Sequence, residues 1–239
     1  MKIMAFDTSA KTASVCVAED GALLGELNTN TKFTHSQTLL PMAQSLLNCL
    51  SLSFSDMDCF AVSTGPGSFT GLRIGIGAVK GLAYGLNRPC AGVSTLDALS
   101  RNLSGADGIV CPVMDARCGQ VYTALFESTP GTIVRTTEDM AISIEELSKR
   151  LQKEKKNVFL VGDGAELCYN NLKDRVCHVY LASNALRYQR ASGVAAAAER
   201  LAASGQTVPA ARLVPVYLRL PQAERERLKK QQAMEENHV

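Results

Sequence analysis

The sequence predicts an α/β protein of two lobes that follow one plan. The opening "MKIMAFDTSAKTASVCVAED" and the later "GIVCPVMDARCGQVYTALFEST" both have the pattern of strand, aspartate, turn and strand. A second pair, "CFAVSTGPGSFTGL" and "NVFLVGDGAELC", has the pattern of strand, glycine turn and helix. Because both pairs occur in the same order, we expect a duplicated unit of hairpin sheet followed by helix and strand. Such echoes also occur by chance in α/β chains, and that alternative stays open here.

The first lobe is expected to begin with three short strands joined by tight turns, where "EDG" is a hairpin signal. Apolar residues at helical spacing predict a helix at 35–51, capped by Thr34. A strand then leads into the glycine turn and a helix at 71–87. "PCAGVS" and "TLDALSRNL" add a strand and a helix, which completes an N-terminal lobe over residues 1–104.

The second lobe is expected over residues 105–219. After its hairpin and its strand–glycine–helix unit, helical patterns at 143–152 and 191–204 are expected to cover this lobe. The final "RLVPVYLRL" either stays with the second lobe or packs back on the first. Residues 220–239 carry opposite charges at helical spacing with almost no apolar face, which predicts a charged, solvated tail.

The composition is typical of a globular protein, with 46% hydrophobic and 20% charged residues. A net charge of +2 and the lack of tryptophan indicate neither a strongly basic surface nor a base-stacking platform for nucleic acid. The eight cysteines contain no CxxC pair and lie mostly in apolar runs, as buried reduced thiols do. No signal peptide or membrane-length apolar run is present, so we expect a cytoplasmic protein.

The glycine turn does not match a standard nucleotide loop. Gly65, Gly67 and Gly71 form GxGxxxG, one residue longer than the dinucleotide fingerprint, and no acidic residue closes the following strand. A Lys-Ser/Thr pair is also missing after the last glycine, which excludes a P-loop. The turn is therefore expected to shape the start of a helix and to bind no phosphate.

The helix after the turn carries two rows of glycines. Gly71 and Gly75 form one row, and Gly77, Gly81 and Gly85 form a second with the same four-residue spacing. Each interior glycine costs about 1 kcal/mol relative to alanine. Bare backbone stripes of this kind predict that the protein's own sheet or another helix approaches closely, with one row facing inward and one outward.

Other candidate sites lie outside this helix. Asp7-Thr8-Ser9 either cradles a phosphate, with Asp7 near a metal, or forms a turn that satisfies its own backbone. Arg117 either grips an anion or fills the cleft. His35, the first of three widely separated histidines, is expected to bond at a helix start. The sequence has no HExxH or GxSxG motif, so neither zinc nor serine hydrolase chemistry is supported.

Five blocks together resemble the TsaB family, also called YeaZ: "MAFDTSAKTASVCV", "HSQTLLPM", "STGPGSFTGLRIG", "VMDARCGQVYTALF" and "PVYLR". The resemblance extends through Arg219 in the right order. It implies the actin/hexokinase/Hsp70-like (ASKHA) two-lobed fold, with duplicated ribonuclease-H-like subdomains and mixed sheets. It also implies that the chain is a paralogue of TsaD, and that both belong to a group once called the glycoprotease family.

The implied function is a non-catalytic scaffold that activates TsaD. With TsaE, the assembly would form N6-threonylcarbamoyladenosine at position 37 of tRNAs that read codons beginning with A. TsaD-like proteins carry an HxxxH metal pair where this chain has Thr95 and Leu99, so no metal and no catalytic residue are expected. We expect a homodimer when TsaD is missing. The chain is expected to contact tRNA only indirectly and to bind no membrane. Whether ATP or ADP lies at the partner interface is open.

The resemblance also assigns the candidate site residues. Helices 35–51 and 71–87 would form the TsaD-binding surface, with His35, Leu39, Leu40, Ala43, Leu47, Gly71, Gly75, Gly77, Ala78, Gly81 and Gly85. The remnants of a nucleotide or phosphate site would be Asp7, Thr8, Ser9, Asp115, Arg117, Gly162 and Gly164.

Two other functions remain as alternatives. One is an ATP-dependent enzyme of the same fold, such as a small-molecule kinase, in which "FDTS" and "LVGDGA" would hold the nucleotide. The other is a metallopeptidase, which would need a metal dyad or an activated nucleophile that the sequence does not supply.

Overall fold

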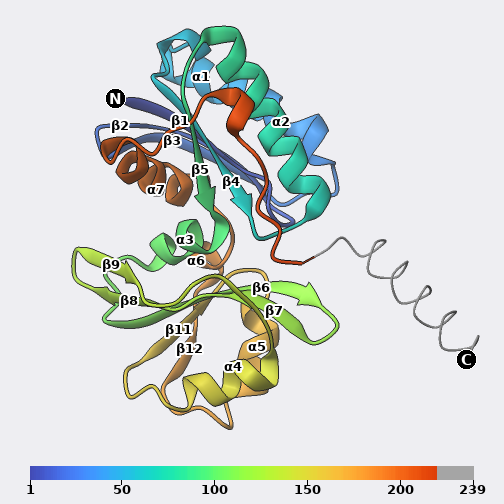
Figure 1. The fold of residues 1–239 in the computed structure, drawn as a ribbon, viewed down its shortest axis with the longest axis vertical. Helices are drawn as coiled ribbons and strands as arrows, with labels where there is room; N and C mark the ends of the chain where they lie inside the picture. The colour runs from blue at the N-terminus through green and yellow to red at the C-terminus, as the bar shows by residue number, and fades with distance from the viewer. Residues whose placement is uncertain (220–239) are drawn as a thin grey trace, which may run out of the picture.

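The computed structural model describes residues 1–219 of the chain and shows two lobes (Figure 1). The first lobe is built on a five-stranded sheet in the order β3-β2-β1-β4-β5. Its antiparallel part and its parallel part meet at β1, which pairs with β2 on one side and with β4 on the other. The strands are β1 (Lys2–Asp7), β2 (Ala13–Glu19), β3 (Ala22–Thr29), β4 (Cys59–Gly65) and β5 (Cys90–Ser94).

The second lobe repeats this order, as β10-β7-β6-β11-β12. Here β6 is the central strand, antiparallel to β7 and parallel to β11. The expected duplication and mixed sheets are therefore confirmed. The strands are β6 (Gly108–Arg117), β7 (Gln120–Thr123), β10 (Met140–Ser143), β11 (Val158–Val161) and β12 (Val179–Leu181), with an added hairpin of β8 (Phe126–Thr129) and β9 (Thr132–Arg135) on the start of β6.

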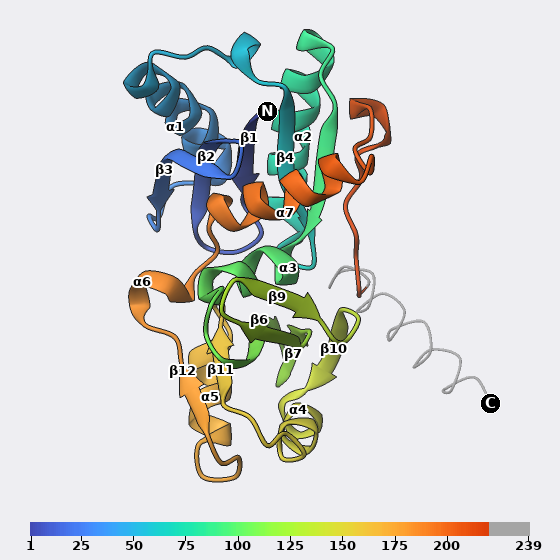
Figure 2. The ribbon, with the colours of Figure 1, turned by 90° about the vertical axis from the view of Figure 1, so that its left-hand side faces the viewer.

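Helices cover both faces of the first sheet. On one face, α1 (His35–Leu50) and α2 (Phe69–Leu86) enclose a core with large side chains such as Phe6, Phe60 and Leu72. On the other, α7 (Ala191–Ala203) packs its alanines on small residues such as Ala5 and Ala61. Figure 2 shows α7 lying across the sheet, above α3. Small side chains on both surfaces let this helix approach the sheet closely.

The position of α7 corrects one expectation. The helix at 191–204 was expected to cover the second lobe, but it packs on the first sheet and on α3 (Thr95–Ser100). Arg190, just before α7, pairs with Glu26 on β3, and Glu26 also accepts the Ser192 N–H at 2.8 Å. Burial raises the pKa of Glu26, but these hydrogen bonds outweigh it and hold that pKa below its usual value.

The second lobe has its own helices and its own core. Its sheet packs on α4 (Ile144–Leu151) and α5 (Ala165–Leu172) through residues such as Val113, Leu147 and Leu160. The Ser143 hydroxyl caps α4 by accepting the Glu146 N–H at 3.0 Å. The remaining short helices are η1 (Phe54–Asp56), η2 (Arg101–Leu103), α6 (Asn184–Arg187) and η3 (Ala210–Arg212).

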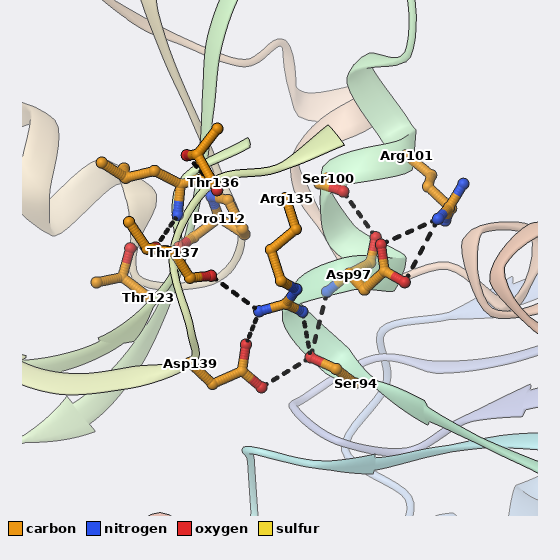
Figure 3. Close-up of polar contacts among 11 residues, drawn as sticks. Ser94, Asp97, Ser100, Arg101, Pro112, Thr123, Arg135, Thr136, Thr137 and Asp139 are labelled. Carbon is orange, nitrogen blue, oxygen red and sulfur yellow. Dashed lines mark hydrogen bonds and ion pairs between the residues drawn. The ribbon is translucent and has the colours of Figure 1, made fainter. Parts of the chain in front are cut away.

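The two lobes meet at α3, which follows β5. Leu96 and Leu99 of α3 are buried with Val110 and Phe126 of the second lobe. A polar network lies beside them (Figure 3): Ser94 Oγ donates to Asp139 at 2.8 Å and accepts from Arg135 at 3.1 Å. Ser94 ends the last strand of the first sheet, so this network joins the first lobe directly to β9 and the loop after it.

The chain returns to the first lobe after α7. Val208 pairs with Cys90 at the edge of β5, with both backbone hydrogen bonds at 2.8 Å. We call residues 213–219 the strap. Its Val216 N–H donates to Thr64 O at 2.8 Å, and Arg219 Nη1 donates to Ala116 O of the second lobe at 2.9 Å. The strap therefore runs along the first lobe and reaches the second.

All eight cysteines lie within residues 1–219 as free thiols, and Cys16, Cys59, Cys90, Cys111 and Cys168 are buried. Among the described residues, the helices are all too short or too polar to cross a bilayer. Residues 220–239, predicted to be a charged, solvated tail, lie outside the described residues.

Candidate functional site

The first glycine row of α2 packs against the protein itself. A Cβ on Gly71 would lie 2.1 Å from the Thr8 backbone oxygen, and one on Gly75 would lie 2.4 Å from Thr8 Oγ1. Thr8 Oγ1 in turn donates to Gly71 O at 2.8 Å. Gly71 and Gly75 were expected in the partner interface, and this is wrong, because both are buried under the β1–β2 loop.

The second glycine row faces solvent. A Cβ on Gly77, Gly81 or Gly85 would meet no atom within 4 Å, and all three residues are exposed. Ala78, beside this row, is half-buried. These glycines leave a bare backbone stripe along the outer side of α2, which no packing within the described chain explains.

The residues expected on α1 divide in the same way. Leu39, Ala43 and Leu47 are almost fully buried in the core of the first lobe, so a partner cannot reach them and their assignment to the interface is wrong. Leu40, on the outer side of α1, is 45% exposed. His35 is half-buried, and its Nε2 donates to Ala10 O at 2.8 Å, which ties the start of α1 to the β1–β2 loop.

The outer surface of α1 and α2 is poor in charge. The sixteen residues of α1 contain no Asp, Glu, Lys or Arg, and α2 contains only Arg73 and Lys80. Tyr84, next to Gly85, is 82% exposed. By contrast, α4 carries exposed ion pairs between Glu145 and Lys149 and between Glu146 and Arg150, as a solvated helix does. Depletion of charge together with exposed aromatic residues is typical of the centre of a protein interface.

The Asp7-Thr8-Ser9 loop does not fit a phosphate or a metal. All three residues are buried, and their polar atoms bond to one another and to α2. Asp7 accepts from the Ser9 N–H at 2.9 Å and from the hydroxyls of Ser9 and Ser63. Burial raises the pKa of Asp7, and these hydrogen bonds only partly oppose the rise. The turn that satisfies its own backbone is the arrangement present.

The glycine turn at residues 65–68 packs against the Asp7-Thr8-Ser9 loop. The Ser68 N–H donates to Ser9 O at 2.7 Å, and a Cβ on Gly67 would lie 2.5 Å from the same oxygen. Ser68 Oγ accepts the Gly71 N–H at 3.2 Å and so caps α2. The N–H groups of Ser68 and Gly71 are therefore bonded within the protein.

In the second lobe, the β11–α5 turn corresponds to the glycine turn, and it packs directly against the backbone of β6. A Cβ on Gly162 would lie 2.1 Å from Val113 O, and one on Gly164 would lie 2.8 Å from Asp115 N. These glycines therefore let the β11–α5 turn press against β6. Asp115 accepts the Arg117 N–H at 2.7 Å, and Arg117 sits in the left-handed region at φ 63° at the tip of the β6–β7 hairpin.

A cleft of 440 Å³ lies between the lobes. It brings Ser9, Asp115 and Arg117 together, whereas Asp7, Thr8, Gly162 and Gly164 do not line it. Sequence reasoning did not assign its other charged side chains, which are Lys11, Asp163 and Arg219. Burial raises the pKa of Asp163, against a hydrogen bond from Gln189. The strap forms one wall of the cleft, and its sequence includes the "PVYLR" block.

The positions aligned with the metal pair are core positions. Thr95 and Leu99 are both buried on α3 at the junction of the lobes, and Leu99 packs against the second lobe. A threonine hydroxyl and an isobutyl group do not supply the imidazole nitrogens that such a pair provides. These residues therefore do not fit a metal.

Comparison with known proteins places the chain in a family. Residues 27–227 match the family model of TsaD, tRNA N6-adenosine threonylcarbamoyltransferase. A curated relative from Bacillus subtilis is 32% identical over 94% of this chain and 96% of its own length, and is named tRNA threonylcarbamoyladenosine biosynthesis protein TsaB. A relative of the same name from Escherichia coli is 32% identical over 92% of this chain and 95% of its own length. The chain belongs to the TsaB family.

Solved structures of TsaB-like proteins agree with this assignment. YeaZ from Pseudomonas aeruginosa is 29% identical, with a TM-score of 0.76 over 91% of this chain and 99% of its own. A Pseudomonas aeruginosa protein described as similar to the peptidase YEAZ is 28% identical, with a TM-score of 0.79 over the same shares. The family resemblance seen in the sequence blocks is confirmed, and the TsaD model match relates this TsaB-family chain to the transferase.

Proposed function

We propose that this chain is a non-catalytic partner that binds and activates TsaD in tRNA threonylcarbamoyladenosine biosynthesis. One observation carries the proposal: the outward glycine row of α2, at Gly77, Gly81 and Gly85, lies on a surface that is poor in charge. Such a stripe lets the backbone of a second helix approach closely. The names of the TsaB relatives give the pathway, and the match to the TsaD model supports TsaD as the proposed partner.

The site chemistry supports a role without catalysis. The Asp7 loop is buried and the Gly162 turn packs against the β6 backbone, so neither forms an open binding site for a nucleotide phosphate. Thr95 and Leu99 supply no metal ligands. Catalysis would then belong to TsaD, with TsaE joining the assembly and position 37 of tRNA as the target. In the absence of TsaD, two copies of this chain would pair through the same surface.

Complex formation tests this proposal. We expect the purified chain and TsaD, mixed in equal amounts, to elute together in size-exclusion chromatography with the mass of a hetero-complex by light scattering. We also expect the chain alone to show no ATP turnover above background. Failure to form a complex, together with ATP turnover that Asp7→Ala abolishes, would instead support the ATP-dependent enzyme.

A further inference from the structure

An arginine lies at the end of the open glycine row. Arg73, Gly77, Gly81 and Gly85 follow one another at four-residue spacing along α2. Rows of this spacing form the ridges and grooves that meet when helices pack. Because glycine has no side chain, the row is a groove, and Arg73 closes it toward the N-terminus of α2.

Arg73 is held in place by two aromatic rings. Its guanidinium carbon lies 3.8 Å from the centre of the Phe69 ring, and its Nε donates to Tyr217 Oη at 3.0 Å. The Tyr217 ring stacks on Phe69 with 4.8 Å between ring centres. Tyr217 belongs to the strap, which descends beside α2 in Figure 1. A charged side chain fixed in this way loses little freedom when it binds a partner.

The charge of Arg73 has no acidic partner within residues 1–219. Its side chain is exposed, and only its Nε takes part in a hydrogen bond with a described residue. Neither α1 nor α2 contains Asp or Glu. Lys80, the other cation of α2, donates to Ala211 O and Leu213 O instead. The terminal nitrogens of Arg73 therefore form a planar donor pair suited to a carboxylate.

We propose that Arg73 anchors TsaD by binding an Asp or Glu side chain on the helix that lies in the glycine groove. This inference rests on the proposed function. The groove repeats every four residues, so a helix seated in it can shift by one turn and make similar contacts. A single charged contact at one end removes this ambiguity and fixes the register, as isolated polar residues do in coiled coils. Preorganised Arg and Tyr residues are also common among the strongest contributors to interfaces.

Isothermal titration of TsaD with Arg73 variants tests the proposal. We expect Arg73→Ala to weaken binding by at least about 10-fold, since a charge-assisted hydrogen bond is lost. The affinity of Arg73→Lys for TsaD should lie between those of Arg73→Ala and wild type, because lysine keeps the charge but not the paired donors. Arg212→Ala, which removes an exposed arginine outside α2, should bind as wild type does. Added salt should weaken the binding of wild type to TsaD more than it weakens the binding of Arg73→Ala.

The outcomes separate the two proposals. If Gly81→Leu prevents binding while Arg73→Ala binds with wild-type affinity and salt dependence, the Arg73 anchor is wrong and the glycine interface stands. If Arg73→Ala binds weakly but Arg212→Ala does so equally, the effect is one of overall charge and the anchor is again wrong. If wild type itself does not bind TsaD, both this inference and the proposed function are overturned.

Discussion

Gly81→Leu is expected to abolish or strongly weaken the complex with TsaD while leaving the chain folded. A Cβ at this position meets open space, so the leucine side chain enters solvent in the free protein. At an interface where two backbones approach closely, an overpacked contact costs about 1–3 kcal/mol, which corresponds to roughly 5- to 150-fold in affinity. Isothermal titration against TsaD measures this loss, and Gly81→Ala should show a smaller one.

A matched variant controls for the leucine itself. Ala196 is an exposed small residue in the middle of α7, on the opposite face of the first sheet, and Ala196→Leu should bind TsaD normally. Gly81→Leu should also unfold at a slightly higher temperature than wild type, because glycine is a poor helix former. Wild-type affinity for Gly81→Leu would show that the outward row is not the docking surface.

Gly71→Ala is expected to cause the largest loss of stability among single-methyl changes in α2. The new Cβ would lie 2.1 Å from the Thr8 backbone oxygen, so the β1–β2 loop must move. That loop also carries the hydrogen bonds of Asp7 and Ser9, which would be disturbed with it. We expect the free energy of unfolding to fall by about 2–4 kcal/mol, as measured by urea denaturation followed by circular dichroism.

Gly77→Ala supplies the control in the same helix. It makes the same chemical change at a position where the Cβ meets nothing within 4 Å. Better helix propensity should then raise the free energy of unfolding by up to about 1 kcal/mol. Equal effects at Gly71 and Gly77 would contradict the division of the glycines into an inward and an outward row.

The repeated lobe plan was visible in the sequence because both lobes keep the same order of strand, turn and glycine. The place of α7 was not. Its apolar pattern, "ASGVAAAAERLAA", shows that one face is buried but not which sheet covers it. The helix follows the second lobe directly in the chain. The contacts that return it to the first sheet, between Glu26 and residues 190–192, join segments far apart in the sequence.

The site was partly predictable for a similar reason. Periodicity located the apolar faces of α1 and α2, but a leucine facing the core and one facing a partner look alike in sequence. Leu39 and Leu40 are neighbours, yet one is buried in the core and the other is exposed. The Arg73–Phe69–Tyr217 cluster depends on the path of the strap, which no local pattern specifies.

The central claim is that this chain acts through its surface and not through chemistry at the Asp7–Ser9 loop. Asp7 is the residue that separates these two possibilities. An asparagine can keep the contacts of Asp7, since its oxygen can accept from Ser9 and its amide can donate to the Ser63 hydroxyl. Asp7→Asn therefore removes the carboxylate but preserves the fold, whereas Gly81→Leu preserves the carboxylate but blocks the surface.

The most direct test is the N6-threonylcarbamoyladenosine content of tRNA, measured by mass spectrometry, in cells whose own copy is replaced by each variant. We expect wild-type levels with Asp7→Asn and a large loss with Gly81→Leu. Loss of the modification with Asp7→Asn, in a protein that still folds and binds TsaD, would contradict the account and place chemistry in this chain.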